Sequence, residues 1–171
     1  YIDKSYAASR ALLSILNDIL DFSKIDAGKM TLETMDFDIE TLLRDLGAVM
    51  AGNHSGKPVE VLFSVSATMT HWVQGDRLRL QQVLINLAGN ALKFTESGSV
   101  VLSLTQRATT ADHVVLRMSV RDSGIGIHPE QLQAIFEGFS QGESSISRRF
   151  GGTGLGLAIS QRLVALMGGE L

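Results

Sequence analysis

The first thirty residues carry a repeating apolar pattern that predicts one long amphipathic helix. From Ala8 the apolar positions are separated by alternating gaps of four and three, the spacing of a helix packed against other helices. These positions are Ala8, Leu12, Ile15, Ile19 and Phe22, and the stripe is widened by Leu13, Leu16 and Leu20. Either a helical bundle or the chain's own domain is expected to cover so broad a stripe. Gly28 marks the predicted end of the helix.

Beyond this helix the pattern changes to short runs that predict alternating strands and helices. Residues 30–37 predict a strand. Asp38 is expected to cap a helix that runs to about Met50, and Glu40 in its first turn suits the helix dipole. Residues 53–58 contain Gly, Ser and Pro and predict a loop.

The rest of the chain predicts a mixed sheet with helices. Residues 59–65 predict a strand, and Asp76 is expected to cap a long helix with apolar residues at helical spacing. Alternating runs over 99–107 and 113–122 predict an antiparallel hairpin, and 156–167 predict a final helix. This order predicts an α/β two-layer sandwich with helices on one face of the sheet, preceded by a helical arm.

Composition narrows the possible functions. The chain has 171 residues, with 15 basic and 18 acidic side chains, so it has no charge excess suited to nucleic acid or an anionic membrane. The absence of cysteine excludes disulfides, thiolate zinc sites and thiol nucleophiles. No apolar run approaches the ~20 residues that span a bilayer, so we expect a soluble segment without membrane contact. Many of the 17 glycines lie between Gly124 and Gly169.

The predicted helix after Asp76 carries an asparagine pair that needs a chemical reason. Asn86 and Asn90 lie one turn apart, and Lys93 follows on a neighbouring part of the surface. Local hydrogen bonding on the helix is one explanation, because a buried amide costs free energy unless it is satisfied. The alternative is that the Asn90 oxygen binds a hard cation held by phosphates, while Lys93 neutralises a phosphate.

Two glycine-containing segments add features of a nucleotide site. Asp122 ends a predicted strand and precedes Gly124 and Gly126, so its carboxylate can accept a hydrogen bond from an amino group such as that of adenine. Such residues are also typical of ordinary turns. Residues 151–160 place backbone N–H groups at a helix start, which suits phosphate. The polar residues 136–150 between these segments predict a mobile lid.

Together and in this order, the motifs resemble the ATP-binding region of bacterial sensor histidine kinases, particularly the hybrid kinases. The segments NLAGNALKFT, DSGIGI, IFEGFSQ and GGTGLGLAIS resemble the family's N, G1, F and G2 boxes, at residues 86–95, 122–127, 135–141 and 151–160. LNDILDFSKIDAGKM, residues 16–30, resembles the second helix of the dimerisation and phosphotransfer domain. The resemblance covers nearly the whole chain.

The resemblance implies two domains. Residues 1–29 are expected to form the helical arm of a four-helix-bundle dimer. Residues 30–171 are expected to form a Bergerat-type (GHKL) ATP-binding domain, with the chain ending where the family's last strand begins. The implied activity is transfer of the ATP γ-phosphoryl group to a histidine.

Carried over by residue, the resemblance assigns a site for ATP and Mg²⁺. Asn86, Asn90 and Lys93 become the catalytic residues: Asn90 as the magnesium ligand, Asn86 beside it, and Lys93 on a phosphate. Phe94 is placed beside the adenine, and Asp122 on its amino group. The further implied nucleotide contacts are Gly124, Gly126, Ile127, Phe139, Arg148, Arg149, Gly152, Thr153, Gly154, Leu155 and Gly156, with packing as the expected contribution of Leu155.

The family's acceptor histidine, in a context such as His-Glu-Ile-Arg-Thr-Pro, is expected on a helix preceding Tyr1. None of the four histidines, His54, His71, His113 and His128, has this context, so surface positions are expected for all four.

The implied partners are ATP, a second kinase chain of the same or another kind, and a response-regulator receiver domain, with no nucleic acid. The implied location is cytoplasmic, either free or as part of a membrane-bound sensor. Two other functions stay open: a regulatory dimerisation module with a silent nucleotide site, and an ATPase of the gyrase, chaperone or mismatch-repair type.

Overall fold

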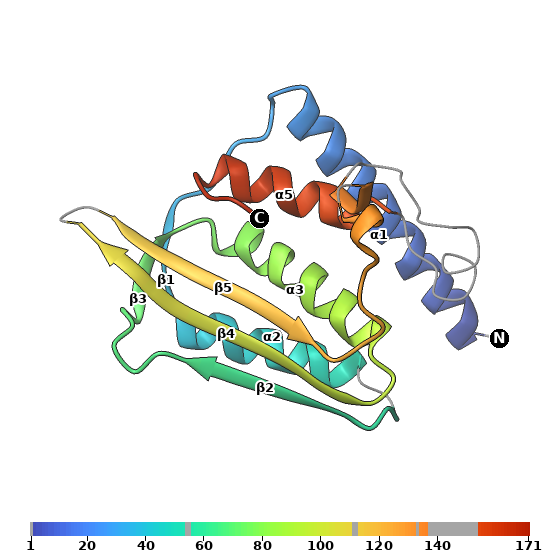
Figure 1. Ribbon diagram of the computed structural model, residues 1–171. Coiled ribbons are helices and arrows are strands. Elements are labelled where there is room, and N and C mark those ends of the chain that lie inside the picture. The colour runs from blue at the N-terminus through green and yellow to red at the C-terminus, as the bar shows by residue number, and fades with distance from the viewer. Residues whose placement is uncertain (1, 54–55, 111–112, 133, 137–153) are drawn as a thin grey trace. The chain divides into compact units, whose positions relative to one another are not determined.

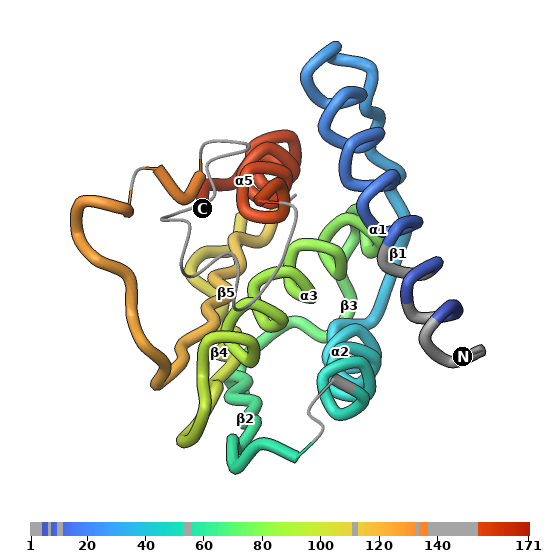
Figure 2. Tube along the Cα trace, turned by 90° about the vertical axis from the view of Figure 1, so that its right-hand side faces the viewer, coloured from blue at the N-terminus to red at the C-terminus, as the bar shows by residue number. Residues whose placement is uncertain are grey.

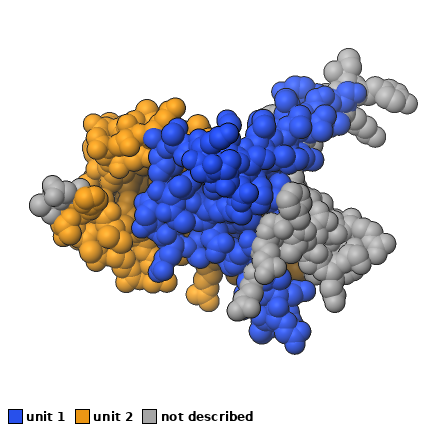
Figure 3. Space-filling model, turned by 90° about the horizontal axis from the view of Figure 1, so that it is seen from above, with its two compact units in different colours: residues 1–32, 128–171 blue, residues 33–127 orange. Residues whose placement is uncertain are grey.

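The computed structural model describes residues 2–53, 56–110, 113–132, 134–136 and 154–171. The chain divides into two compact units, coloured separately in Figure 3. We call residues 33–127 the sandwich unit, and residues 1–32 with 128–171 the helical unit.

The sandwich unit is built on a small mixed sheet. Its elements are β1 (Met35–Asp38), α2 (Ile39–Asn53), β2 (Val59–Val65), β3 (Trp72–Gly75), α3 (Arg77–Phe94), β4 (Gly98–Thr109) and β5 (Val114–Asp122). In the order β2-β4-β5, β2 runs parallel to β4, and β4 runs antiparallel to β5. Helices α2 and α3 lie on one face of this sheet (Figure 1), and Figure 2 shows the same two layers from the side. The predicted α/β sandwich is confirmed.

The core of the sandwich unit follows from period-two burial in β4. Val100, Leu102 and Leu104 alternate with less buried residues, so one face of the strand is apolar. They form one cluster with Leu42 and Leu46 of α2, which are fully buried, and with residues of α3. Both helices are thereby held against the sheet by the removal of apolar surface from water.

The helical unit contains α1 (Ile2–Asp26), two short 3₁₀ turns η1 (Pro129–Gln131) and η2 (Ala134–Phe136), and α5 (Gly156–Leu166). Helix α1 ends as predicted, with Gly28 at a φ of +64°. The Lys29 amide donates to the Lys24 carbonyl at 2.8 Å, and Gly28 donates to Ile25 at 3.0 Å, which is the Schellman arrangement.

Helices α1 and α5 contact each other through one arginine. The Arg162 guanidinium lies 2.9 Å from the Asp26 carboxylate and 4.2 Å from the centre of the Phe22 ring. An ion pair and a cation–π contact therefore join the end of α1 to α5.

Most predicted elements are confirmed, and two expectations are corrected. The strand expected over 30–37 is too long, because β1 pairs only over Met35–Asp38 with four residues of β3, and earlier residues have no strand partner. The sequence pattern did not predict β3, which is only Trp72–Gly75. The loop expected from residue 53 begins later, since α2 extends to Asn53. The predicted lid lies mainly outside the described residues.

Candidate functional site

Helix α3 carries three of the predicted site residues on one surface. The helix is started by Asp76, whose carboxylate accepts a hydrogen bond from the Arg79 amide at 2.9 Å. One face is buried in the core, formed by Val83, Leu84, Ala88, Ala91 and Leu92. Asn86, Asn90 and Lys93 are half-buried and follow one another at spacings of four and three. The amphipathic helix thus fixes their common orientation.

Asn90 has the chemistry of a ligand for a hard cation. Its side chain makes no hydrogen bond to any residue that the structure describes. An amide oxygen of this kind binds Mg²⁺ without adding negative charge beside phosphates. Among the described residues, no three His, Asp or Glu side chains cluster as a metal site.

Lys93 lies near the end of the same helix and is partly shielded from water. Desolvation by burial lowers the pKa of its ammonium group from the ordinary value. Its Nζ atom lies 5.0 Å from the centre of the Phe94 ring, a cation–π distance. The electrostatic attraction between a partly desolvated cation and an anionic phosphate is stronger than the attraction between the same charges in bulk water.

The turn after β5 lies directly against the end of α3. Asp122 is the last residue of β5, and its exposed carboxylate accepts a hydrogen bond from the Gly124 amide at 2.9 Å. The Ile125 amide donates to the Phe94 carbonyl at 3.4 Å. A Cβ added at Gly124 would lie 2.4 Å from that same oxygen, so the close approach requires glycine. The N and G1 motifs therefore meet through backbone.

Ser123 holds the other side of this turn. Its Oγ accepts a hydrogen bond from the Ser99 amide at 2.9 Å, and its own amide donates to the Ser99 carbonyl at 3.1 Å. Gly98, with φ of +114°, leaves space for this hydroxyl, because a Cβ there would lie 2.2 Å from Ser123 Oγ. The turn is thus fixed to both α3 and the start of β4.

The remaining predicted residues fall into three groups. Gly126 has φ of +71°, and Ile127 ends the sandwich unit with an exposed side chain. Gly154, Leu155 and Gly156 belong to the helical unit, where Leu155 is buried, in keeping with packing. Phe139, Arg148, Arg149, Gly152 and Thr153 lie outside the described residues. The structure therefore joins the turn of residues 122–127 to the end of α3 at Phe94. We call this turn, with Phe94 and the residues Asn86, Asn90 and Lys93 of the same helix, the α3–β5 site.

Of the four histidines, three are described and all three are exposed, as expected. His71 and His113 lie in loops, and His128 precedes η1. His128 Nδ1 lies 3.7 Å from the Glu130 carboxylate. His54 lies outside the described residues.

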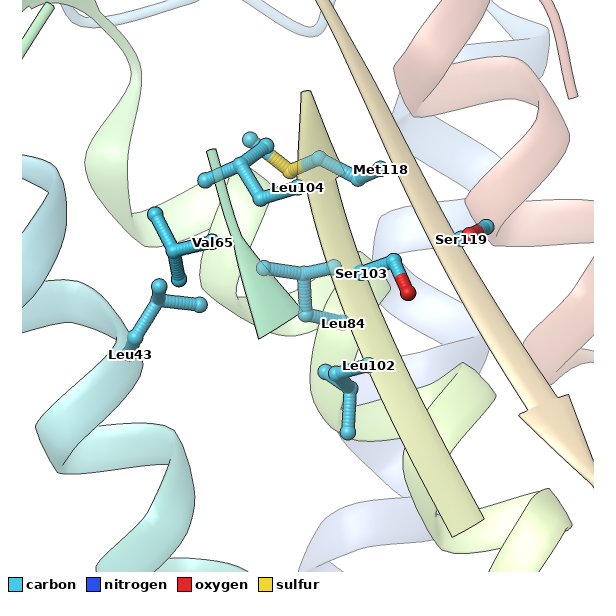
Figure 4. A pocket seen from close by; sticks show the side chains of 8 residues that line it. All are labelled: Leu43, Val65, Leu84, Leu102, Ser103, Leu104, Met118 and Ser119. Carbon is cyan, nitrogen blue, oxygen red and sulfur yellow. The ribbon is translucent and has the colours of Figure 1, made fainter. Parts of the chain in front are cut away.

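A small pocket in the sandwich unit has a lining without charged side chains, unlike the α3–β5 site (Figure 4). It is lined by Leu43, Val65, Leu84, Leu102, Ser103, Leu104, Met118 and Ser119, with no charged side chain. The α3–β5 site shares none of these residues. The pocket is therefore a gap in the apolar core rather than a candidate nucleotide site.

Sequence reasoning missed one residue at the α3–β5 site. The Lys57 Nζ atom donates to the carbonyl oxygens of Leu92, Lys93 and Thr95 at 3.0, 3.2 and 3.1 Å. The residue lies in the loop before β2, at least 35 positions from each acceptor. A side chain that contacts the backbone of residues so distant in the sequence produces no local sequence pattern. Only the folded structure therefore identifies the role of Lys57.

Comparison with known proteins decides the family. A model described as "Histidine kinase-, DNA gyrase B-, and HSP90-like ATPase" matches residues 75–171. The chain belongs to this ATPase family. The match includes all of α3, the turn after β5 and the described part of the G2 motif.

Two similar proteins are named as a sensor protein and a histidine-protein kinase. The sensor protein GacS of Pseudomonas syringae pv. syringae is 46% identical over 94% of this chain, which is 18% of that protein. The histidine-protein kinase BarA of Escherichia coli K12 is 43% identical over 94% of this chain and 17% of its own. The chain thus spans less than a fifth of the length of these curated relatives.

A solved structure supports the same assignment. Full-length ShkA, crystallised in complex with AMPPNP, matches with a TM-score of 0.77 and 37% identity, over 98% of this chain and 35% of that one. The chain accordingly contains an ATPase domain of this family that is similar to those of histidine kinases. Among the described residues, no helix combines the length and apolar character needed to cross a bilayer.

We expect Gly124→Ala to destabilise the protein by roughly 1–3 kcal/mol, because the new methyl group would overlap the Phe94 carbonyl. Gly89→Ala is the matched control, since no described atom lies within 4 Å of a Cβ there and the position is helical. That change is expected to stabilise by up to about 1 kcal/mol. Urea unfolding of both variants measures the difference, and equal midpoints would contradict the contact.

Proposed function

We propose that this chain is the ATP-binding catalytic region of a two-component sensor histidine kinase, which transfers the γ-phosphoryl group of Mg-ATP to a histidine. The observation that carries the proposal is the backbone contact between Phe94 at the end of α3 and the turn at Gly124 and Ile125. It brings a carboxylate suited to adenine beside a helix end with groups suited to phosphate and Mg²⁺.

The turn after β5 recognises the base in this proposal. The Asp122 carboxylate accepts a hydrogen bond from the adenine amino group, and Gly124 and Gly126 let the ring approach the backbone. The exposure of Asp122 leaves the carboxylate accessible, while its hydrogen bond from the Gly124 amide fixes its direction. Phe94 and Ile127 contribute apolar surface beside the ring.

The α3 surface holds the phosphates and the metal. Asn90 supplies an amide oxygen to Mg²⁺, Asn86 lies one turn away, and Lys93 neutralises a phosphate. These residues fit a magnesium ion that takes most of its ligands from phosphate oxygens and water. When bound, Mg²⁺ would supply neutralisation of the phosphate charge.

The motifs also assign residues outside the α3–β5 site to the nucleotide. Gly154, with φ of +71°, and Gly156, the first residue of α5, offer backbone N–H groups at a helix start. Gly152, Thr153, Phe139, Arg148 and Arg149 are assigned to phosphate contact and closure over the nucleotide by their place in the motifs. Leu155 is assigned to packing, in keeping with its burial.

Phosphoryl transfer requires mainly positioning and charge neutralisation from the protein. The half-buried surface of Asn86, Asn90 and Lys93 is suited to both, because its groups are held by one helix. The acceptor imidazole must approach the γ-phosphorus in line with the leaving oxygen. None of the three described histidines lies in a helix that could present it.

We also propose that α1 pairs with a second kinase chain and that a receiver domain takes the phosphoryl group from the histidine. Leu12 and Leu16 of α1 are about half exposed, at 58% and 48%, and several neighbouring apolar side chains are exposed as well. A stripe of this kind on one helix is stabilised by pairing with another helix. The proposed location is the cytoplasmic side, where ATP is available.

We expect this chain to dimerise through α1. Leu12→Glu should raise the dimer dissociation constant at least roughly tenfold, because a charge at the helix seam must be desolvated. Ser14→Glu is the matched control, since residue 14 is exposed and lies on the opposite side of the helix. Sedimentation equilibrium measures both variants, and a wild-type chain that stays monomeric at high concentration would contradict the pairing.

The base and metal assignments can be separated by two substitutions. Asp122→Ala should weaken ATP and ADP alike by roughly 10- to 100-fold, because a charged hydrogen bond to adenine is worth ~1.5–3 kcal/mol. Asn90→Ala should weaken mainly the magnesium-dependent part of binding. Calorimetric titrations with and without Mg²⁺ give the comparison, and equal losses for both variants in all conditions would refute the assignment.

Incubation with γ-labelled ATP tests the transfer reaction itself. The 171 residues alone should bind Mg-ATP without labelling themselves, because none of their histidines has the acceptor context. Adding a polypeptide with the acceptor helix should produce acid-labile, alkali-stable label on that polypeptide. Label of this kind on the 171-residue chain would contradict the prediction, and absent ATP binding would favour a silent regulatory module.

A further inference from the structure

The end of α3 has an unusual set of partners for its last carbonyl groups. A helix leaves its final four C=O groups without partners inside the helix. In α3 these belong to Ala91, Leu92, Lys93 and Phe94. These carbonyls belong to the last turn of α3, which also bears the proposed phosphate contact Lys93 and the apolar base contact Phe94. The groups that donate hydrogen bonds to these carbonyls therefore also set the geometry of the site.

All four carbonyls accept hydrogen bonds, and the donors come from three different residues. Ala91 accepts hydrogen bonds from the amide and the hydroxyl of Thr95, at 3.1 and 2.8 Å. Phe94 accepts from the Ile125 amide at 3.4 Å. Leu92 and Lys93 accept from the Lys57 ammonium at 3.0 and 3.2 Å. Two of the four carbonyls therefore depend on one lysine.

Lys57 is well suited to this role. Its ammonium group has three N–H donors, and its three acceptors are the carbonyls of Leu92, Lys93 and Thr95. A positive charge at a helix C-terminus also interacts favourably with the helix dipole. Thr95, the third acceptor, is fully buried. The ammonium thus joins the last turn of α3 to the first residue beyond it.

The backbone that carries Lys57 is itself held by the sheet. The next residue, Pro58, accepts a hydrogen bond from the Gly98 amide at 3.1 Å, and Val59 pairs with Gly98 in the parallel ladder. Gly98 also adjoins Ser123 of the turn after β5. Lys57 therefore projects from a fixed strand start toward the end of the helix.

We infer that Lys57 is a positioning residue of the nucleotide site, which acts through the last turn of α3. It sets the orientation of Asn90 and Lys93 along that turn, and it holds the Phe94 carbonyl in place for Ile125. This inference rests on the proposed ATP-binding function. It adds a residue that lies outside the N, G1, F and G2 motifs.

The test compares Lys57→Met with the wild-type chain at a temperature where circular dichroism shows both to be folded. The variant keeps the length of the side chain and removes the three donors. Its dissociation constant for Mg-ATP should rise roughly tenfold, because the turn loses charged hydrogen bonds that fix its geometry. Lys29→Met is the matched control, since Lys29 is exposed and its side chain has no hydrogen bond among the described residues.

Two further measurements separate positioning from a purely structural contribution. In amide NMR spectra without nucleotide, Lys57→Met should shift the signals of Thr95 and Ile125, while Lys29→Met leaves them unchanged. In a double-mutant cycle, the magnesium-dependent loss caused by Asn90→Ala should be smaller in the Lys57→Met background, because both act through one turn. A structural contribution alone would lower the melting temperature and leave the two losses additive.

The outcomes distinguish this inference from the function on which it rests. If the wild-type chain binds no Mg-ATP, the proposed function fails and the inference fails with it. If the wild-type chain binds and folded Lys57→Met binds equally well, only the inference is overturned. Should Lys57→Met fail to fold, Lys57→Gln takes its place, and wild-type affinity in that variant overturns the inference in the same way.

Discussion

The site depends on one backbone contact, the approach of the turn after β5 to the last carbonyl of α3. The Ile125 amide donates a hydrogen bond to the Phe94 carbonyl, and Gly124 has no side chain that would keep the turn away from the end of α3. This contact is set by the sheet, because Asp122 pairs opposite Val100 at the end of β5. The helix is set by its apolar face. Strand register and helix packing together therefore determine where the carboxylate of Asp122 lies relative to Asn90 and Lys93.

Much of this arrangement could be predicted from sequence because its signals are local. Helical spacing placed Asn86, Asn90 and Lys93 on one surface, and alternation predicted the β4–β5 hairpin that carries Asp122 to the site. Asp38 and Asp76 were recognisable as helix caps, because each carboxylate accepts a hydrogen bond from a backbone amide only three residues further along the chain. Each of these inferences required only a short window of sequence.

The features that escaped prediction depend on residues far apart in the chain. Strand β3 has four residues, too few for a pattern, and exists because β1 pairs with it. The same pairing limits β1 to Met35–Asp38 and explains why the expected strand was too long. Lys57 has no local signal at all, because its acceptors are backbone carbonyls that every residue type possesses.

The position of the site at a helix C-terminus creates an electrostatic problem for a polyphosphate ligand. The carbonyl end of a helix carries a partial negative charge, which disfavours anions nearby. Two ammonium groups lie at this end of α3. Lys57 donates hydrogen bonds directly to the last carbonyls of the helix. Lys93 projects from the final turn, where burial lowers its pKa and so destabilises its charged form in the free protein. A phosphate beside Lys93 would reverse that penalty, since an opposite charge favours the protonated ammonium. In the proposed function, the two lysines together make the helix end compatible with phosphate: Lys57 offsets the partial charge of the helix, and Lys93 attracts the ligand.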